Sequence, residues 1–168
     1  MTPDNSLGPL LPTQGARALP WLSVVAGSLL TALPVVATVP LLPPFGLLTL
    51  LAWRLLVRFS MRRWAAAPLG FVDDLVSGQP LGSAVLLWSL CFLFVDLAEQ
   101  RLAFRDFWQD WLIASGLIAF TLLIGRLLAV SATAHVDFAM TFQLLASILL
   151  FPVAMRVVAW IDVRRAYK

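Results

Sequence analysis

The chain has 168 residues, of which 61% are hydrophobic and 12% are charged. A soluble domain carries about 25% charged residues, so half that proportion excludes an ordinary water-facing surface. The net charge of +3 comes from scattered basic residues, which excludes the basic patch of a nucleic-acid-binding protein. The one cysteine, Cys91, lies in an apolar run and has no internal disulfide partner, so we expect it to be a buried packing residue.

The first 18 residues are rich in proline, glycine and polar residues and predict a flexible tail. The apolar run that follows is longer than the hydrophobic part of a signal peptide, so we interpret it as a retained first span. A transmembrane helix needs about 20 mostly apolar residues. By that measure the sequence predicts an all-α membrane helical bundle over residues 19–165, with residues 166–168 as its C-terminal end. Its six spans are expected at 19–40, 44–59, 64–79, 81–98, 108–130 and 138–161.

Spans two and three are short, and the basic residues decide the number of crossings. They occur at every second connection, and the connections between them contain no lysine or arginine. Because positively charged loops stay in the cytoplasm, this alternation predicts six spans with both termini cytoplasmic. The residues concerned are Arg58, Arg62 and Arg63, then Arg101 and Arg105, and finally Arg164, Arg165 and Lys168.

The tryptophans fall into two groups. Five lie near predicted span ends, where indole rings favour the headgroup level of the bilayer: Trp21, Trp64, Trp108, Trp111 and Trp160. Trp53 and Trp88 lie deeper in their spans, and we expect them to pack between helices. The charged stretch 99–110 between spans four and five predicts either a short interfacial helix or a solvated loop.

Four residues of the third span and the turn after it recur every fourth position: Gly70, Asp74, Gly78 and Gly82. On a continuous helix they form one stripe, and its small residues allow another backbone to approach closely. An acidic residue in such a stripe is costly in hydrocarbon and should face protein or a polar cavity. The simpler interpretation is that residues 78–82 form only a turn. We adopt it for those residues, but it leaves Asp74 unexplained.

Arg126 is the expected partner of this acidic residue. Helix geometry places Arg126 in the outer half of the bilayer, within side-chain reach of Asp73 and Asp74. We favour Asp74, because Asp73 points about 100° away and would line a polar cleft open to the outside. The alternative is that Arg126 extends to the outer headgroups without a partner. Near the inner ends of their spans, we expect Arg54, Arg58, Arg156 and Asp96 to reach the headgroups in the same way.

The sequence lacks the residues of a catalytic or metal site. His135 is the only histidine and has no second histidine or cysteine with which to bind zinc. No glycine-rich phosphate loop or nucleophile elbow is visible. We therefore predict no cofactor, no metal and no enzymatic activity.

The segment 68–82, Pro-Leu-Gly-Phe-Val-Asp-Asp-Leu-Val-Ser-Gly-Gln-Pro-Leu-Gly, resembles a motif of the rod shape-determining membrane protein family MreD. That family has a glycine, an aspartate four residues later, and a Gly-x-Pro-Leu-Gly turn that enters the next helix. The length, the proline-rich turn at 41–44 and the Trp53-Arg54 pair also fit, although this family usually has an aromatic pair there. The matching motif residues are Gly70, Asp74, Gly78, Pro80, Leu81 and Gly82.

This resemblance implies a non-catalytic scaffold of the bacterial elongation machinery in the inner membrane. It would bind MreC, together with a RodA-type glycosyltransferase and its penicillin-binding transpeptidase, and would connect indirectly to MreB filaments. The family is also distantly similar to the six-helix substrate-binding subunits of energy-coupling factor transporters, and we expect that architecture here.

A second hypothesis belongs to another class of protein: a transport subunit that binds a small molecule or lipid in a pocket open to the outside beside Asp74. The predicted outer loops are short for a ligand-binding subunit, so we favour the scaffold. Co-purification distinguishes the two, since a scaffold would retain a single-span partner and a transport subunit an ATPase.

Overall fold

The structure is a computed structural model that describes residues 14–32, 42–57, 61–78, 80–101, 106–128 and 137–166. Within these ranges the chain is entirely helical and contains no strand, which confirms the predicted all-α class. The elements are α1 (Gln14–Ala32), α2 (Phe45–Leu56), the 3-10 turn η1 (Arg63–Ala65), α3 (Ala66–Ser77), α4 (Ser83–Arg101), α5 (Phe107–Leu128) and α6 (Asp137–Ala166).

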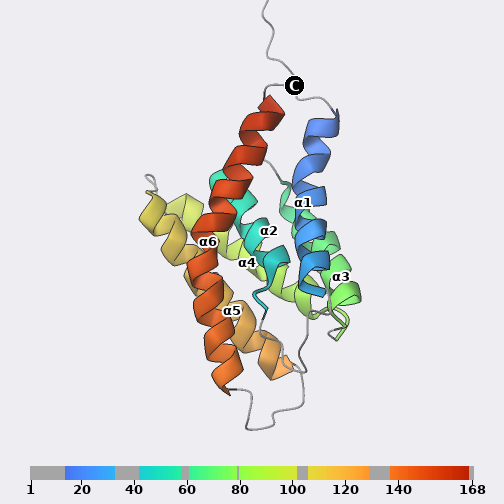
Figure 1. The fold of residues 1–168 in the computed structure, drawn as a ribbon, viewed down its shortest axis with the longest axis vertical. Coiled ribbons are helices and arrows are strands. Elements are labelled where there is room, and N and C mark those ends of the chain that lie inside the picture. Colours follow the sequence, from blue (N-terminus) through green and yellow to red (C-terminus); the bar gives the residue numbers. More distant parts are fainter. Residues whose placement is uncertain are drawn as a thin grey trace, which may run out of the picture.

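Successive helices run in alternating directions, so that α1 begins and α6 ends at the same end of the molecule (Figure 1). α3 packs against α1 and α4, α2 against α1 and α6, and α5 against α4 and α6. α1 begins inside the segment predicted to be a tail, whereas residues 1–13 lie outside the described ranges. α4 extends to Arg101 and α5 starts at Phe107, so helices occupy most of the described part of the charged stretch between them.

α2 lies at the centre of the bundle. Its residues Leu50 to Leu55 are all buried. Apart from Arg54 these residues are apolar, as expected of a helix that is covered on every side. Trp53 is fully buried and its Nε1 donates a hydrogen bond to Ser23 Oγ of α1 at 2.7 Å. Trp88 and Cys91 of α4 are also buried, so all three sequence-based packing assignments are confirmed.

Three helical segments are long and apolar enough to cross a membrane: Ser83–Arg101, Phe107–Leu128 and Met140–Arg164. Two shorter apolar helices, Ala18–Thr31 and Phe45–Leu56, accompany them. α2 and α3 have 12 residues each, which corresponds to about 18 Å against a hydrocarbon thickness of about 30 Å. The number of crossings therefore remains a prediction. The similarity to the transporter subunits is a separate expectation and also remains a prediction.

Candidate functional site

Asp74 lies at the junction of α3 and α4, and its side chain caps the start of α4. The residue is 1% exposed. Its Oδ1 accepts hydrogen bonds from the Ala84 backbone N–H at 2.8 Å and from Ser83 Oγ at 3.0 Å. Its Oδ2 accepts from the Gly82 N–H at 2.8 Å and from the Val85 N–H at 3.4 Å. A helix N-terminus has unpaired N–H groups and a partial positive charge, so a buried carboxylate is stabilised there.

Gly70 lies one turn before Asp74 and brings the two helices together. A Cβ at this position would stand 2.7 Å from the Ala84 carbonyl oxygen and 2.8 Å from Val85 Cα. Both are backbone atoms of the first turn of α4, and they cannot move without displacing the helix. The predicted close approach at Gly70 is therefore an internal contact between α3 and α4.

The other motif residues form the turn that joins these helices. Gly78 and Gly82 have φ values of 67° and 97°, a region that residues with a Cβ rarely adopt. Pro80 and Leu81 are exposed between them, and Leu81 is 71% exposed. Of the four residues in the predicted stripe, Gly70 and Asp74 lie on α3, which ends at Ser77. Gly78 and Gly82 belong to the turn.

The predicted ion pair between Asp74 and Arg126 does not form in this structure. Both carboxylate oxygens of Asp74 accept hydrogen bonds at the start of α4, whereas Arg126 Nη1 lies 3.3 Å from Met140 Sδ of α6. The cause is the packing order, because α3 lies against α1 and α4 while α5 lies against α4 and α6. Asp73 faces the start of α2, where its Oδ1 would be 3.2 Å from a Cβ added to Gly46. Both carboxylate oxygens of Asp74 already accept hydrogen bonds from α4 and the turn before it. Asp74 therefore has no free oxygen for the outward-facing ligand pocket of the transport hypothesis.

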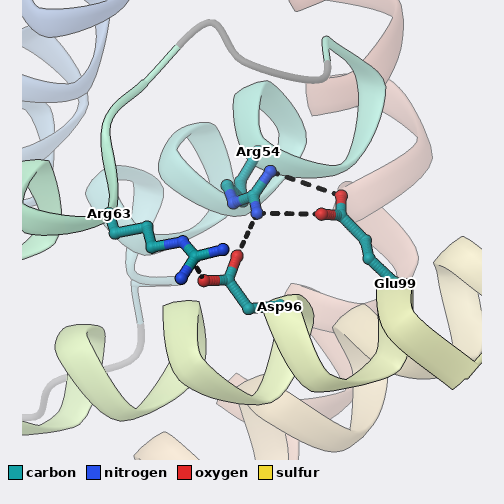
Figure 2. A network of polar contacts seen from close by, with 4 residues as sticks. All are labelled: Arg54, Arg63, Asp96 and Glu99. Atoms are coloured by element: carbon teal, nitrogen blue, oxygen red, sulfur yellow. Dashed lines mark hydrogen bonds and ion pairs between the residues drawn. The ribbon is translucent and has the colours of Figure 1, made fainter.

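A second polar centre connects α2, η1 and α4 (Figure 2). Arg54 Nη1 and Nη2 donate to Glu99 Oε1 and Oε2 at 3.3 and 2.9 Å, and Nη2 also contacts Asp96 Oδ1. Arg63 Nε lies 2.9 Å from Asp96 Oδ2. The side chains of Arg54 and Asp96 are each 9% exposed, whereas that of Arg63 is 81% exposed. The guanidinium of Arg54 also lies over the ring of Phe92, 5.8 Å from its centroid.

This network replaces the separate headgroup contacts expected for Arg54 and Asp96. A charge buried to this degree is costly unless it is paired and hydrogen-bonded. One local signal in the sequence points to such a network: Asp96 and Glu99 are three residues apart, so they share a face of α4. The charge alternation also places Arg54 and this pair toward the same end of the bundle. Arg58 lies outside the described residues, and Arg156 is exposed.

An open cavity of about 520 Å³ adjoins the network. Its walls come from the end of α2, the segment before α3 and the end of α4. The lining residues are Arg54, Met61, Arg62, Arg63, Asp96, Glu99 and Gln100. Within the described residues no group of three or more His, Cys, Asp or Glu side chains could hold a metal ion. His135 lies outside those residues.

These features define a class: a helical membrane protein in which buried ionisable groups connect helices to one another. A family model of the rod shape-determining protein MreD matches residues 16–163. The chain therefore belongs to the MreD family, which gives it a role in rod shape determination. Comparisons with curated proteins and with solved structures find no match.

Proposed function

We propose that this protein is a non-catalytic scaffold of the cell-elongation machinery in the bacterial inner membrane, with both termini in the cytoplasm. It binds MreC and a RodA-type glycosyltransferase with its penicillin-binding transpeptidase, and so links MreB filaments indirectly to peptidoglycan synthesis. The observation that carries this proposal is the family match over residues 16–163.

The distribution of polar and apolar side chains supports a role in association. Asp74, Arg54 and Asp96 are buried, and each contacts backbone or side-chain partners on another element. The longer helices instead present large apolar side chains on their outer surfaces, among them Leu93, Leu123 and Leu149, which are all more than half exposed. Such surfaces are suited to lipid and to the helices of membrane partners.

Site-directed photocrosslinking in native membranes tests this proposal. A photoreactive residue in place of Leu93, Leu123 or Leu149 should crosslink a single-span partner from at least one of the three helices. Ile118 is fully buried, so the same replacement there is the matched control and should give no intermolecular product. Recovery of an ATPase instead would favour a transport subunit. Turnover of a lipid or peptidoglycan precursor by the purified protein would contradict a non-catalytic role.

A further inference from the structure

The cavity beside the ion network contains more basic than acidic groups. Three arginines and two carboxylates line it. Asp96 and Glu99 are occupied by Arg54, and Asp96 also contacts Arg63. Arg62 is exposed and takes part in no ion pair among the described residues. After these pairings, one positive charge remains at the cavity.

Arg63 is held in place with most of its hydrogen-bonding capacity unused. Its Nε is anchored by Asp96 Oδ2 at 2.9 Å, but 81% of its side chain is exposed. The two terminal nitrogens of the guanidinium form no ion pair within the described part of the chain and can donate toward the cavity. Because its Nε is already anchored by Asp96, Arg63 would lose less freedom when a ligand binds than an unanchored arginine would.

We propose that this cavity binds a phosphate group, and that its usual occupant is the headgroup of an anionic phospholipid. The planar fork of a guanidinium matches two phosphate oxygens, and Arg62 supplies a second positive charge beside it. The carboxylates do not oppose this, since arginines already neutralise them. The cavity volume of about 520 Å³ is within the range of small-ligand sites.

The neighbouring tryptophans favour a lipid over a soluble anion. Trp64 directly follows Arg63, is 58% exposed and lies 5.7 Å from the ring of Trp21. Exposed indoles on a membrane protein favour the headgroup level. The C-terminal ends of α2 and α4 line the cavity, and both helices run toward the end of the bundle where α6 finishes (Figure 1). The proposed function places this end at the cytoplasmic leaflet, where basic groups favour anionic lipids.

Native mass spectrometry of the full chain in detergent tests this inference. Titration with phosphatidylglycerol should give more lipid adducts than titration with phosphatidylcholine. The double variant Arg62→Gln/Arg63→Gln should bind phosphatidylglycerol about tenfold more weakly, since it loses charge-assisted hydrogen bonds. Arg164→Gln is the matched control, because Arg164 is also exposed and its guanidinium stacks on Trp160 at 3.7 Å. The control should bind as the unmodified protein does.

Arg62→Gln alone keeps the test valid if the double variant fails to fold, because Arg62 lies outside the ion network. Millimolar inorganic phosphate in lipid-free detergent is then added to both proteins. If it raises the melting temperature of the unmodified protein but not that of Arg62→Gln, the result would support the phosphate site with a soluble occupant. The inference would be overturned if phosphate leaves the melting temperature unchanged and either of two results is found. One is that the two lipids bind equally. The other is that Arg164→Gln loses as much phosphatidylglycerol binding as the double variant does. The inference would also be overturned if Arg62→Gln no longer binds an acidic protein partner but binds lipid as the unmodified protein does.

Discussion

Asp74 shows how a helix can begin without a capping side chain of its own. The residue before α4 is Gly82, which has no side chain and a positive φ of 97°. The carboxylate of Asp74 supplies the missing acceptor from the preceding helix, 2.8 Å from the N–H groups of Gly82 and Ala84. The cap therefore also fixes the position of α3 relative to α4, and its loss should affect both the helix and its packing.

Asp74→Ala should lower the free energy of unfolding by roughly 2–3 kcal/mol, since it removes a helix cap and leaves buried N–H groups without an acceptor. Thermal unfolding in detergent measures the change. Asp73→Asn is the control, because Asp73 is adjacent but faces α2. We also expect Asp74→Ala to impair rod shape in cells. Equal melting temperatures for Asp74→Ala and the unmodified protein would refute the cap.

Gly70 offers a second prediction at the scale of one residue. Gly70→Ala should lower the melting temperature clearly, because the new Cβ would be 2.7 Å from a backbone oxygen of α4. Gly116→Ala is the control: the Cβ that alanine adds there meets nothing within 4 Å, and alanine favours a helix by about 1 kcal/mol over glycine. If both variants melt alike, the two helices do not approach closely at Gly70.

At the scale of helices, the ion network joins α4 to two segments that lie earlier in the chain. α2 contributes Arg54, η1 contributes Arg63, and α4 contributes Asp96 and Glu99 (Figure 2). Arg54 is the residue that both acidic side chains share. A buried pair adds little net stability compared with apolar residues, but removing one member leaves the other charge buried.

Arg54→Met should therefore destabilise the protein by roughly 3–5 kcal/mol. Asp96→Asn should also destabilise it, and the double variant should cost less than the sum of the single changes, because the two residues interact. Detergent melting of all four proteins completes the cycle. Arg156→Met makes the same chemical change at an exposed position of α6 and should be nearly neutral. Strict additivity would show that Arg54 and Asp96 do not interact.

For the whole molecule, the alternating helix directions agree with termini on one side of the membrane. In a Cys91→Ala background, cysteines at residues 5 and 168 should be protected from an impermeant thiol reagent in intact cells. Leu81→Cys, in the exposed turn between α3 and α4, should react. Labelling of either terminal site from outside would break the six-span prediction, and a protected Leu81→Cys would show that α3 does not cross.

Composition and local pattern were sufficient for the helical class, the MreD resemblance, the burial of Trp53 and Trp88, and the turn at Gly78 and Gly82. Each of these depends on residues close together in the chain or on the apolar content of whole segments. The partners of the buried charges depended on which helices lie side by side. Depth alone made Arg126 a reasonable partner for Asp74, but α3 packs on α1 and α4 whereas α5 packs on α4 and α6, so the carboxylate caps α4 instead. The same packing brings Arg54 to Asp96 and Glu99, a contact that spans more than 40 positions and that no local rule specifies.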